Sequence, residues 1–383
     1  MKQYLLFLLL LIGCTNSNKA GLENEEGVKN IDGFKFAAHA LDDTTLFKEF
    51  HIVPLETNND SYIRKISRIY RTNDDIYILD QELDKLIIFD TNGNYRRKIE
   101  NIGYGPHEYL SLMDFCLDTE KEEIILMCDR PYKIMRFKYD GQYVDEIKNT
   151  DLFGNVVMND GYIYCNRIDS DKSDLNEYEI SYMSTDGESR GNILERRENI
   201  TNKTYNRGSF LNRSKYIYYT RRFDNRVYQI TKGKFTEKYW LDFGKFNVPE
   251  HLSGEQNFKK FIAECEDNKY IYSITEFVEN EKYIMFLTNQ AICLYDKDTE
   301  TFTGYPIINN TEYKIGSNTF LANGNDENSI FTTIDPAILY MLEDVAEYNE
   351  NIASLFEKVK EDDNPILFFY QFKHCCPKKF SQT

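Results

Sequence analysis

The sequence predicts an all-β fold, a six-bladed β-propeller with two helical insertions. Short runs of β-branched and aromatic residues alternate with turn residues, and turn glycines recur at a nearly constant interval. The 383-residue chain is also rich in aromatic residues, at 15%, and has only 8 prolines, a composition that suits a large β-rich core. Because a closed array of repeats can form one domain at this length, we expect a single propeller domain.

One repeat is complete between residues 75 and 99. Its three strand-like runs are Asp75–Asp80, Lys85–Asp90 and Tyr95–Ile99, and polar turns separate them. This order predicts an antiparallel meander. The pattern starts again at Met113.

Turn glycines mark the following repeats. Gly93, Gly141, Gly187 and Gly233 follow one another at intervals of 46 to 48 residues, a period typical of four-stranded propeller blades. Each lies where a tight hairpin requires positive φ, which glycine adopts at little cost. An aromatic and aliphatic strand in each repeat gives the count of six, namely Ile76–Leu79, Ile124–Met127, Tyr162–Cys165, Tyr216–Tyr219, Tyr283–Leu287 and Ile330–Thr333.

The two ends of the predicted propeller are expected to meet. The strand-like run Phe47–Leu55 contains Pro54, which suits an edge strand or its end, and Ile366–Phe372 is a second such run near the C-terminus. A propeller avoids exposed edges by pairing its ends, so we expect these two strands to share one blade.

Two segments interrupt the repeat and have helical spacing. In Pro249–Asp267 the apolar residues Phe258, Phe261, Ile262 and Cys265 recur at helical intervals. In Pro336–Lys360 a proline stands near the start, and Ile338, Leu339, Leu342 and Val345 share one face. Both segments are predicted to be helices that cover the β-core.

The N-terminus predicts export and lipid anchoring. Residues 1–13 carry one charge and the apolar run Tyr4–Ile12, which is too short for a permanent membrane span and is typical of a signal peptide. Leu11-Ile12-Gly13-Cys14 resembles a bacterial lipobox, which implies cleavage before Cys14 and a lipid on its thiol. An ordinary signal peptide followed by a chance cysteine is the alternative.

The lipobox implies an outer-membrane lipoprotein in the envelope of a Gram-negative bacterium, facing the periplasm or the cell surface, with the membrane as its partner through Cys14. We therefore divide the chain into a signal peptide (1–13), a lipidated tether (14–45), the propeller (46–373) and a C-terminal tail (374–383). A net charge of −17 disfavours nucleic acid as a partner. The seven other cysteines lack regular spacing, so most are expected to be small apolar core residues.

The segment Gly103–Tyr109 is the candidate ligand-binding loop. It joins the outer strand of one blade to the inner strand of the next, and His107, Glu108 and Tyr109 offer an ionisable ring, a carboxylate and an aromatic face. We predict a site there for a neutral or cationic ligand. The alternative is that the segment locks adjacent blades, with Glu108 capping backbone N–H groups and Tyr109 packed between blades.

Other candidate sites have simpler explanations. The five histidines are accompanied by neither a Gly-x-Ser-x-Gly nor a His-Glu-x-x-His motif, so no catalytic residue is assigned. His374-Cys375-Cys376 cannot close a metal site alone, and Asp169, Asp171 and Asp174 lack the glycine and glutamate of a calcium loop. The Arg221, Arg222 and Arg226 cluster could hold an anion or pair with acidic residues across strands. No cofactor or metal is predicted.

Four short segments together resemble a known family. Val53–Glu56, Phe89–Gly93, Gly103–Tyr109 and Asn364–Leu367 are similar to segments of the six-bladed β-propeller lipoproteins of gut anaerobes, distant relatives of NHL-repeat propellers. The resemblance covers roughly residues 45 to 373, and it departs from the family at His107, where glycine is usual. It implies an association with glycan uptake.

The predicted function is that of a lipid-anchored envelope protein that binds a ligand or acts as a scaffold, with a glycan or an envelope protein as partner. The alternatives are a lyase or glycosidase with its active site at the channel mouth, and a structural partner of an outer-membrane complex. A cluster of His, Tyr, Arg and carboxylates in a deep channel would favour the enzyme, whereas a shallow aromatic rim would favour the binding protein.

Overall fold

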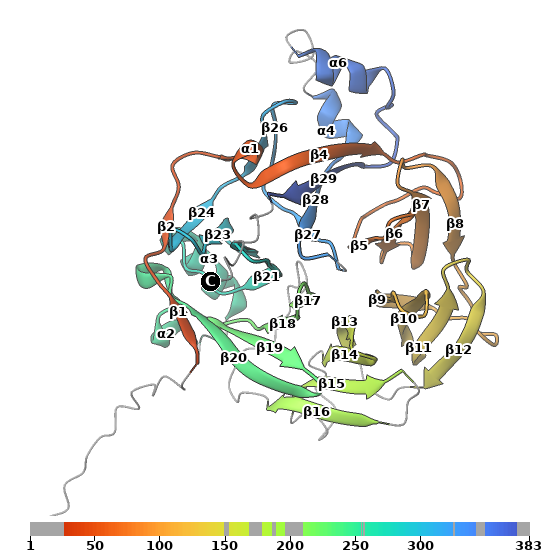
Figure 1. The fold of residues 1–383 in the computed structure, drawn as a ribbon, viewed down its shortest axis with the longest axis horizontal. Coiled ribbons are helices and arrows are strands. Elements are labelled where there is room, and N and C mark those ends of the chain that lie inside the picture. The colour runs from red at the N-terminus through yellow and green to blue at the C-terminus, as the bar shows by residue number, and fades with distance from the viewer. Residues whose placement is uncertain are drawn as a thin grey trace, which may run out of the picture.

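The computed structural model describes residues 27–148, 153–167, 178–185, 189–195, 210–253, 255, 257–324, 326–341 and 349–373. These residues form a β-propeller, with sheets arranged around a central axis and helices confined to the periphery (Figure 1). The predicted all-β propeller class is therefore confirmed. No helix among the described residues is long and apolar enough to cross a membrane.

Three sheets are built from four consecutive antiparallel strands. The first contains β5 (Arg68–Arg71), β6 (Asp75–Asp80), β7 (Lys85–Asp90) and β8 (Tyr95–Ile99). The second contains β9 (Ser111–Asp118), β10 (Glu123–Arg130), β11 (Tyr132–Lys138) and β12 (Tyr143–Lys148). The third contains β13 (Phe153–Asn159), β14 (Tyr162–Arg167), β15 (Tyr178–Ser184) and β16 (Arg190–Glu195).

Two further sheets gain a fifth strand from the N-terminal segment. One contains β17 (Leu211–Arg213), β18 (Ile217–Thr220), β19 (Arg226–Thr231) and β20 (Lys234–Leu241), with β1 (Lys29–Ile31) parallel to β20. The other contains β21 (Ile274–Glu279), β22 (Tyr283–Thr288), β23 (Ile292–Asp296) and β24 (Thr301–Tyr305), with β2 (Lys35–Phe36) parallel to β24.

The last two sheets combine strands from both ends of the chain. One has the order β27 (Leu321–Ala322), β28 (Ser329–Ile334), β29 (Ile366–Phe372) and β4 (Phe47–Pro54). The other has the order β26 (Ile315–Ser317), β25 (Ile308–Asn310) and β3 (Leu41–Asp42).

The expectation of six blades is corrected, because the described residues form seven sheets. The sheet that was not predicted is the short one of β3, β25 and β26, whose strands have only two or three residues. Such strands are too short to show a periodic pattern in the sequence. Around the axis, neighbouring inner strands contact one another in the order β5, β9, β13, β17, β21 and β27, and β27 contacts β5 again.

The predicted closure of the ring is confirmed. β29 pairs antiparallel with β4, in a register that runs from Ile366 opposite Pro54 to Phe372 opposite Phe47. Buried Asn364 fixes the start of β29, because its side-chain nitrogen donates to the carbonyls of Glu56 and Ser61, both at 2.9 Å. Amide pairing and side-chain contacts thus join the two ends of the propeller.

The predicted hairpin glycines have the expected backbone. Gly93, Gly141 and Gly233 have φ values of 90°, 89° and 72°, whereas Gly187 lies outside the described residues. Gly93 is also required sterically, since a Cβ atom there would lie 2.1 Å from the carbonyl oxygen of Pro54. The β7–β8 turn of the first sheet therefore packs directly on β4.

The predicted tether is corrected in part. Residues 29–42 form β1, β2 and β3 and add them to three sheets, so this part of the predicted 14–45 segment belongs to the propeller. Ile31 is buried against the core beside Leu241. The signal peptide, Cys14 and residues up to 26 lie outside the described residues, as does the predicted tail from residue 374.

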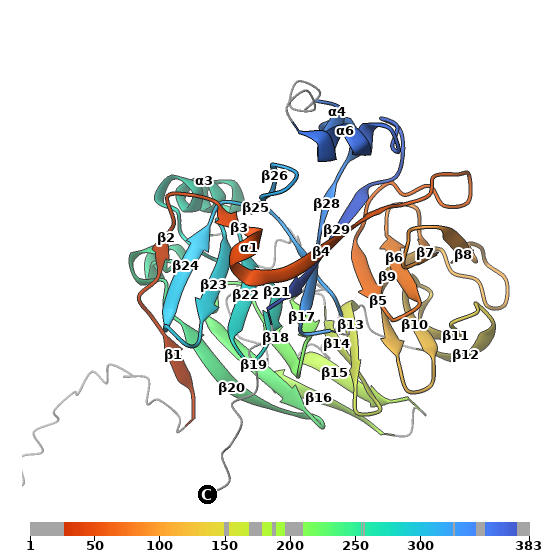
Figure 2. The same ribbon diagram turned by 45° about the horizontal axis from the view of Figure 1, so that its top comes forward.

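Both helical insertions are confirmed. The first contains α2 (Glu250–Ser253) and α3 (Phe258–Asn268), where Phe261 and Cys265 are buried. The second contains α4 (Pro336–Tyr340) and α6 (Glu350–Phe356), which stand beside β4, β28 and β29 (Figure 2). Leu342 and Val345 lie outside the described residues. The remaining short helices are α1 (Asp43–Leu46) and the 3-10 turn Gly244–Phe246.

The described cysteines behave as apolar core residues, as predicted. Cys116, Cys128, Cys165, Cys265 and Cys293 are all buried and free. Burial raises the pKa of Cys128 and of Cys265 to about 12, so these thiols stay protonated and unreactive near neutral pH.

Candidate functional site

The predicted loop at residues 103–109 makes contacts typical of a lock between sheets. Tyr109 is fully buried, and its hydroxyl donates to the carbonyls of Asp84 (3.0 Å) and Ile99 (3.2 Å). Burial raises the pKa of this phenol above its ordinary value. Tyr109 therefore presents no ring face on which a ligand could stack.

The other two residues of the predicted site also contact the protein itself. The Glu108 carboxylate accepts a hydrogen bond of 2.6 Å from the N–H of Gly105. His107 has a φ of 64°, and its ring lies 3.9 Å from that of Tyr143 between centroids. These contacts are those of the alternative interpretation, and a ligand-binding role for His107, Glu108 and Tyr109 stays a prediction.

The arginine cluster is resolved in favour of structural pairing for Arg221. Its guanidinium is buried and lies 2.8 Å from Glu179 and 2.9 Å from Asp224. Tyr228 donates to the same Asp224 carboxylate at 3.0 Å. Arg226 lies 3.2 Å from Glu237 on the adjacent strand. Asp169, Asp171, Asp174 and the His374-Cys375-Cys376 run lie outside the described residues.

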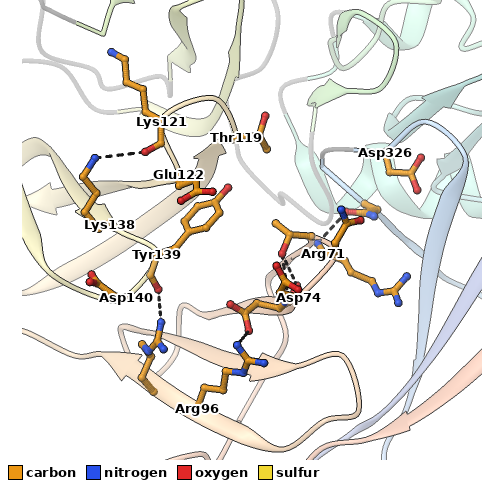
Figure 3. Close-up of a pocket in the computed structure, with 15 residues that line it drawn as sticks. Arg71, Asp74, Arg96, Thr119, Lys121, Glu122, Lys138, Tyr139, Asp140 and Asp326 are labelled. Atoms are coloured by element: carbon orange, nitrogen blue, oxygen red, sulfur yellow. Dashed lines mark hydrogen bonds and ion pairs between the residues drawn. The ribbon is translucent and has the colours of Figure 1, made fainter.

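A large cavity lies on the opposite face of the propeller from the 103–109 loop. It has a volume of about 960 Å³ and opens between the sheets β5–β8 and β9–β12 (Figure 3). Its walls come from the β5–β6, β9–β10 and β11–β12 turns, strand β8 and the loop between β27 and β28. The lining is Arg71, Thr72, Asn73, Asp74, Asp75, Arg96, Arg97, Thr119, Lys121, Glu122, Lys138, Tyr139, Asp140, Asn323 and Asp326.

This cavity, the turn cleft, is highly polar and balanced in charge. Its lining has five cationic and five anionic side chains, in a protein whose net charge is −17. Most of the cations are engaged. Arg96 lies 2.9 Å from Asp75, and Arg97 donates to the carbonyl of Tyr139 at 2.5 Å. The cleft thus combines fixed charges of both signs with many hydrogen-bonding groups.

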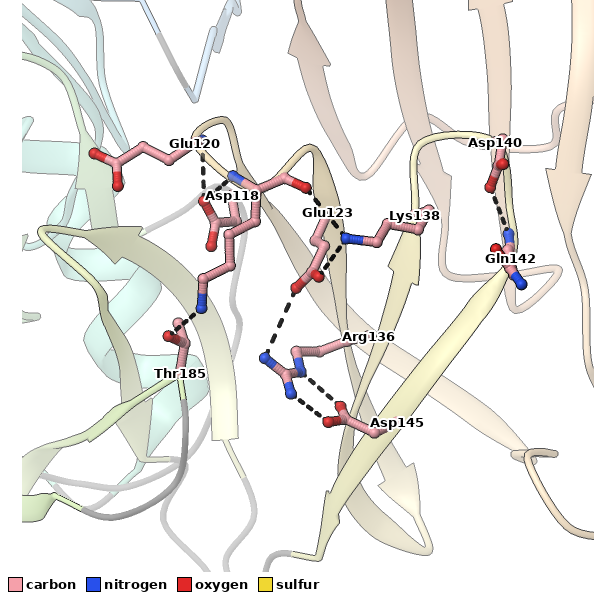
Figure 4. Close-up of polar contacts among 10 residues, drawn as sticks. Asp118, Glu120, Glu123, Arg136, Lys138, Asp140, Gln142, Asp145 and Thr185 are labelled. Carbon is pink, nitrogen blue, oxygen red and sulfur yellow. Dashed lines mark hydrogen bonds and ion pairs between the residues drawn. The ribbon is translucent and has the colours of Figure 1, made fainter.

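A polar ladder on the sheet β9–β12 supports one wall of the turn cleft (Figure 4). Lys138 lies 2.8 Å from Glu123, and Arg136 lies between Glu123 and Asp145. The Arg136 side chain donates two hydrogen bonds to the Asp145 carboxylate, and this pairing lowers the pKa of that carboxyl. Lys121 donates to the hydroxyl of Thr185 on the next sheet at 2.9 Å. These contacts hold the lysines of the wall in place.

Two tyrosine hydroxyls are buried in and next to the wall of the turn cleft. They belong to Tyr77 and Tyr139, whose ring centroids are 5.3 Å apart. Burial raises the pKa of both phenols, and it also raises the pKa of neighbouring Asp75 more than Arg96 lowers it. Both hydroxyls are therefore protonated donors near neutral pH.

The propeller axis is crossed by a buried ion pair. Arg68 on β5 lies 3.4 Å from Asp114 on β9, and its guanidinium also donates to the Val156 carbonyl on β13 at 3.2 Å. Asp114 in turn accepts from the N–H of Val156 at 2.8 Å. These contacts tie three inner strands together across the axis, and both charged groups are buried.

A smaller cavity adjoins the turn cleft on the side of strand β4. Its volume is about 280 Å³, and Arg71 belongs to the walls of both cavities. Its other walls include His51 and Phe369, whose rings are stacked at 6.1 Å between centroids. We call it the side pocket.

None of the histidines in the described residues lines the turn cleft itself. The described residues also contain no cluster of potential metal ligands.

Neither cavity was predicted from the sequence. The walls of the turn cleft come from turns at residues 71–75, 119–122 and 138–140, which are separated in the sequence. The common signal was a charged turn at the same end of successive repeats. These charged turns form a cleft only because the fold places the sheets side by side.

Comparison with known proteins gives a family and a fold. Residues 36–371 match the model of the family described as Domain of unknown function (DUF4934). A solved structure from Bacteroides fragilis, described as an exported protein, is 18% identical, with 90% of this chain and 100% of that chain covered and a TM-score of 0.73. At this identity the likeness shows the propeller fold alone.

Two more distant structures have TM-scores below 0.5. A DUF4221 member from Bacteroides vulgatus is 10% identical, with 86% of this chain and 97% of that chain covered and a TM-score of 0.48. Virginiamycin B lyase from Staphylococcus aureus is 12% identical, with 84% and 99% covered and a TM-score of 0.46. The search of curated proteins finds no match. The NHL-like and lipoprotein parts of the expected resemblance stay predictions.

Proposed function

The chain belongs to the family described as Domain of unknown function (DUF4934), and from this premise we propose that it is an exported envelope propeller that binds a polar ligand in the turn cleft. The observation that carries the proposal is the cleft itself, about 960 Å³ lined by ten charged side chains and several neutral polar ones. Its size lies at the upper end of the range for small-molecule sites. A polar ligand would exchange its hydration for these fixed groups.

Export and lipid anchoring complete the proposal. They rest on the signal-like residues 1–13 and on the lipobox that ends at Cys14. The similar Bacteroides fragilis structure is described as an exported protein, which agrees with export of this chain. In this picture the outer membrane holds the propeller through Cys14, and a glycan or an envelope protein is the partner.

The anchor gives a direct prediction. Cys14→Ser removes the thiol that would carry the lipid, so incorporation of labelled fatty acid should fall to background and the protein should accumulate as a precursor or in soluble form. The matched control is Ser17→Ala, which leaves the thiol in place. Labelling that persists in Cys14→Ser would rule the anchor out.

The rival function is a lyase or glycosidase. It is supported by the carboxylates of the cleft, including Asp74, Glu122 and Asp326, which could serve as acid and base groups. The residues that line the cleft include no histidine, so an acid or base group here would be a carboxylate or a lysine. A binding protein would release its captured ligand unchanged, whereas an enzyme would release a shortened or unsaturated product.

The experiment is capture of ligands from the native envelope by the anchored protein, scored for both glycans and proteins. Asn73→Trp should fill the mouth of the cleft, because Asn73 is exposed there. Asp298→Trp, on an exposed turn of the sheet β21–β24, is the matched control. We expect the control to retain the captured ligand and Asn73→Trp to lose it. Equal capture by both folded variants would overturn the proposal.

A further inference from the structure

Arg71 lines both the turn cleft and the side pocket, and its side chain lies in the wall between them. Its backbone lies at the end of β5, where its N–H donates to the Asn323 side chain at 3.1 Å. Its guanidinium lies over the ring of Phe369, 4.2 Å from the centroid. A ligand longer than one cavity would have to pass this side chain.

Among the described residues, each of the other four cations of the cleft has a side-chain hydrogen-bond or ion-pair partner, whereas the Arg71 guanidinium has none. Arg96 has Asp75, Lys138 has Glu123, Arg97 has the Tyr139 carbonyl and Lys121 has the Thr185 hydroxyl. Among the residues that the structure describes, no carboxylate forms an ion pair with Arg71. Burial lowers the pKa of Arg71 despite the attraction of Asp326, which agrees with a desolvated and weakly compensated guanidinium.

Such a guanidinium is suited to a carboxylate. The planar fork can donate two parallel hydrogen bonds to the two oxygens, and a partly desolvated site strengthens this pairing. The surrounding groups suit hydroxyls, since Thr72, Asn73 and Asn323 supply neutral donors and acceptors. Five carboxylates in the lining and the net charge of −17 oppose a densely charged polyanion. The favoured ligand therefore carries an isolated carboxylate among neutral hydroxyl groups.

We propose that Arg71 binds the carboxylate of an acidic sugar unit, and that the turn cleft and the side pocket hold neighbouring units of the same saccharide. This inference deepens the proposed function and rests on it. The uronic acid class is favoured over an acidic peptide because the turn cleft offers polar groups on nearly every wall and few apolar surfaces for peptide side chains.

The test is calorimetric titration of residues 14–383, produced without the signal peptide and carrying Cys14→Ser so that no lipid is attached, with cellobiouronic acid and with cellobiose. The two sugars differ in one carboxylate. We expect the acid to bind at least about tenfold more tightly than the neutral sugar, since a tenfold ratio corresponds to only about 1.4 kcal/mol. Arg71→Gln should reduce the affinity for the acid to that for cellobiose, and Arg71→Lys should keep part of the difference.

The control is Arg64→Gln, which removes an exposed arginine at the other end of the β5–β8 sheet and should keep the full preference. The melting temperature of each variant verifies folding. Arg71→Gln that keeps the preference overturns the inference, and so does tighter binding of the dipeptide Gly-Glu than of the acidic sugar.

The remaining outcomes separate the two proposals. The wild type could bind both sugars with equal affinity, and Asn73→Trp could lose this binding. That result overturns the role of Arg71 and keeps the turn cleft as a binding site. Absence of sugar binding together with successful capture from the envelope also overturns only this inference. Absence of both sugar binding and capture overturns both.

Discussion

Tyr109 fixes the segment between two sheets through a single hydroxyl. It donates to carbonyls of Asp84 and Ile99, which belong to the turn after β6 and to the end of β8. Tyr109→Phe keeps the buried ring and should lower the free energy of unfolding by about 1 kcal/mol. Tyr109→Ala also opens a cavity and should lower it by roughly 3 to 5 kcal/mol. Denaturant unfolding measures both changes.

The control for this prediction lies in the same loop. Tyr104 is 92% exposed, so Tyr104→Ala should leave the unfolding curve nearly unchanged. If Tyr109→Ala instead kept full stability and lost ligand binding, the original prediction of a site at His107, Glu108 and Tyr109 would be supported in place of the lock.

Asp75 gives the protein a defined dependence on pH. Burial raises the pKa of its carboxyl in the folded state above the ordinary value near 4, although Arg96 opposes this change. The folded state therefore binds this proton more tightly than the unfolded state does. The contribution of Asp75 to the free energy of unfolding is lowest above the folded pKa and rises as the pH falls toward the unfolded pKa.

Asp75→Asn removes this titration. Relative to the wild type, the variant should be more stable at pH 7 than at pH 4, by on the order of 1 kcal/mol for each unit by which the pKa is raised. Urea unfolding at both pH values measures the difference, and Asp74→Asn, an exposed carboxylate in the same turn, is the control. An advantage of Asp75→Asn that grows on acidification would contradict the assigned direction.

At this scale the sequence could suggest alternatives for a residue but could not choose between them. The Gly-x-Gly-Pro-x-Glu-Tyr order allowed both a binding loop and a lock, because each uses a carboxylate beside glycines. The choice depends on what surrounds Tyr109, and one of its partners, Asp84, stands 25 residues away. Arg71 is a similar case, since its contacts with Asn323 and Phe369, both about 250 or more residues away, reveal its position.

Secondary-structure elements were predictable where the signal is local. The hairpin glycines follow from the backbone angles of a tight turn, and α3 follows from its apolar spacing. The structure adds the helix cap, Asn257, whose side chain accepts from the N–H of Lys260. The strands β6 to β8 likewise follow from short β-rich runs between polar turns.

Strands that form only by pairing with segments far away in the sequence could not be predicted from local patterns. β3 has two residues, and it becomes a strand only because Leu41 and Asp42 pair with Ile308 and Asn309. β1 adds to β20 in parallel across a similar separation in sequence. The turn cleft has the same origin, because the turn after β5 meets the loop before β28 only when the ring closes. Its residues were visible in the sequence, but their proximity was not.

Closure governs the whole molecule, because the first and last strands of the propeller share one sheet. β29 lies between β28 and β4 and pairs with both along its length. Removing it would expose two strand edges at once and would release Asn364 from Glu56, Ser61 and Ile63. Exposed edges of this kind promote aggregation.

Two truncations test this dependence. Deletion of residues 364–383 should lower the melting temperature and produce aggregates in size-exclusion chromatography, whereas deletion of 374–383 alone keeps β29 and should behave as the full chain does. If the variant without residues 364–383 remained monomeric with an unchanged melting temperature, β29 would not be what holds the ring closed.

A reversible lock tests the same closure without removing any strand. Glu49 and Gln371 face each other across β4 and β29, so Glu49→Cys with Gln371→Cys places two thiols at neighbouring positions of an antiparallel pair. The disulfide would join residues far apart in the sequence, and such a long loop could add up to about 5 kcal/mol if the bond is unstrained. We expect the oxidised variant to melt at a higher temperature than the wild type and reduction to abolish the gain, while the single variant Gln371→Cys should show neither effect. An oxidised variant with no gain would mean that the ends of the propeller separate only after the rest has unfolded.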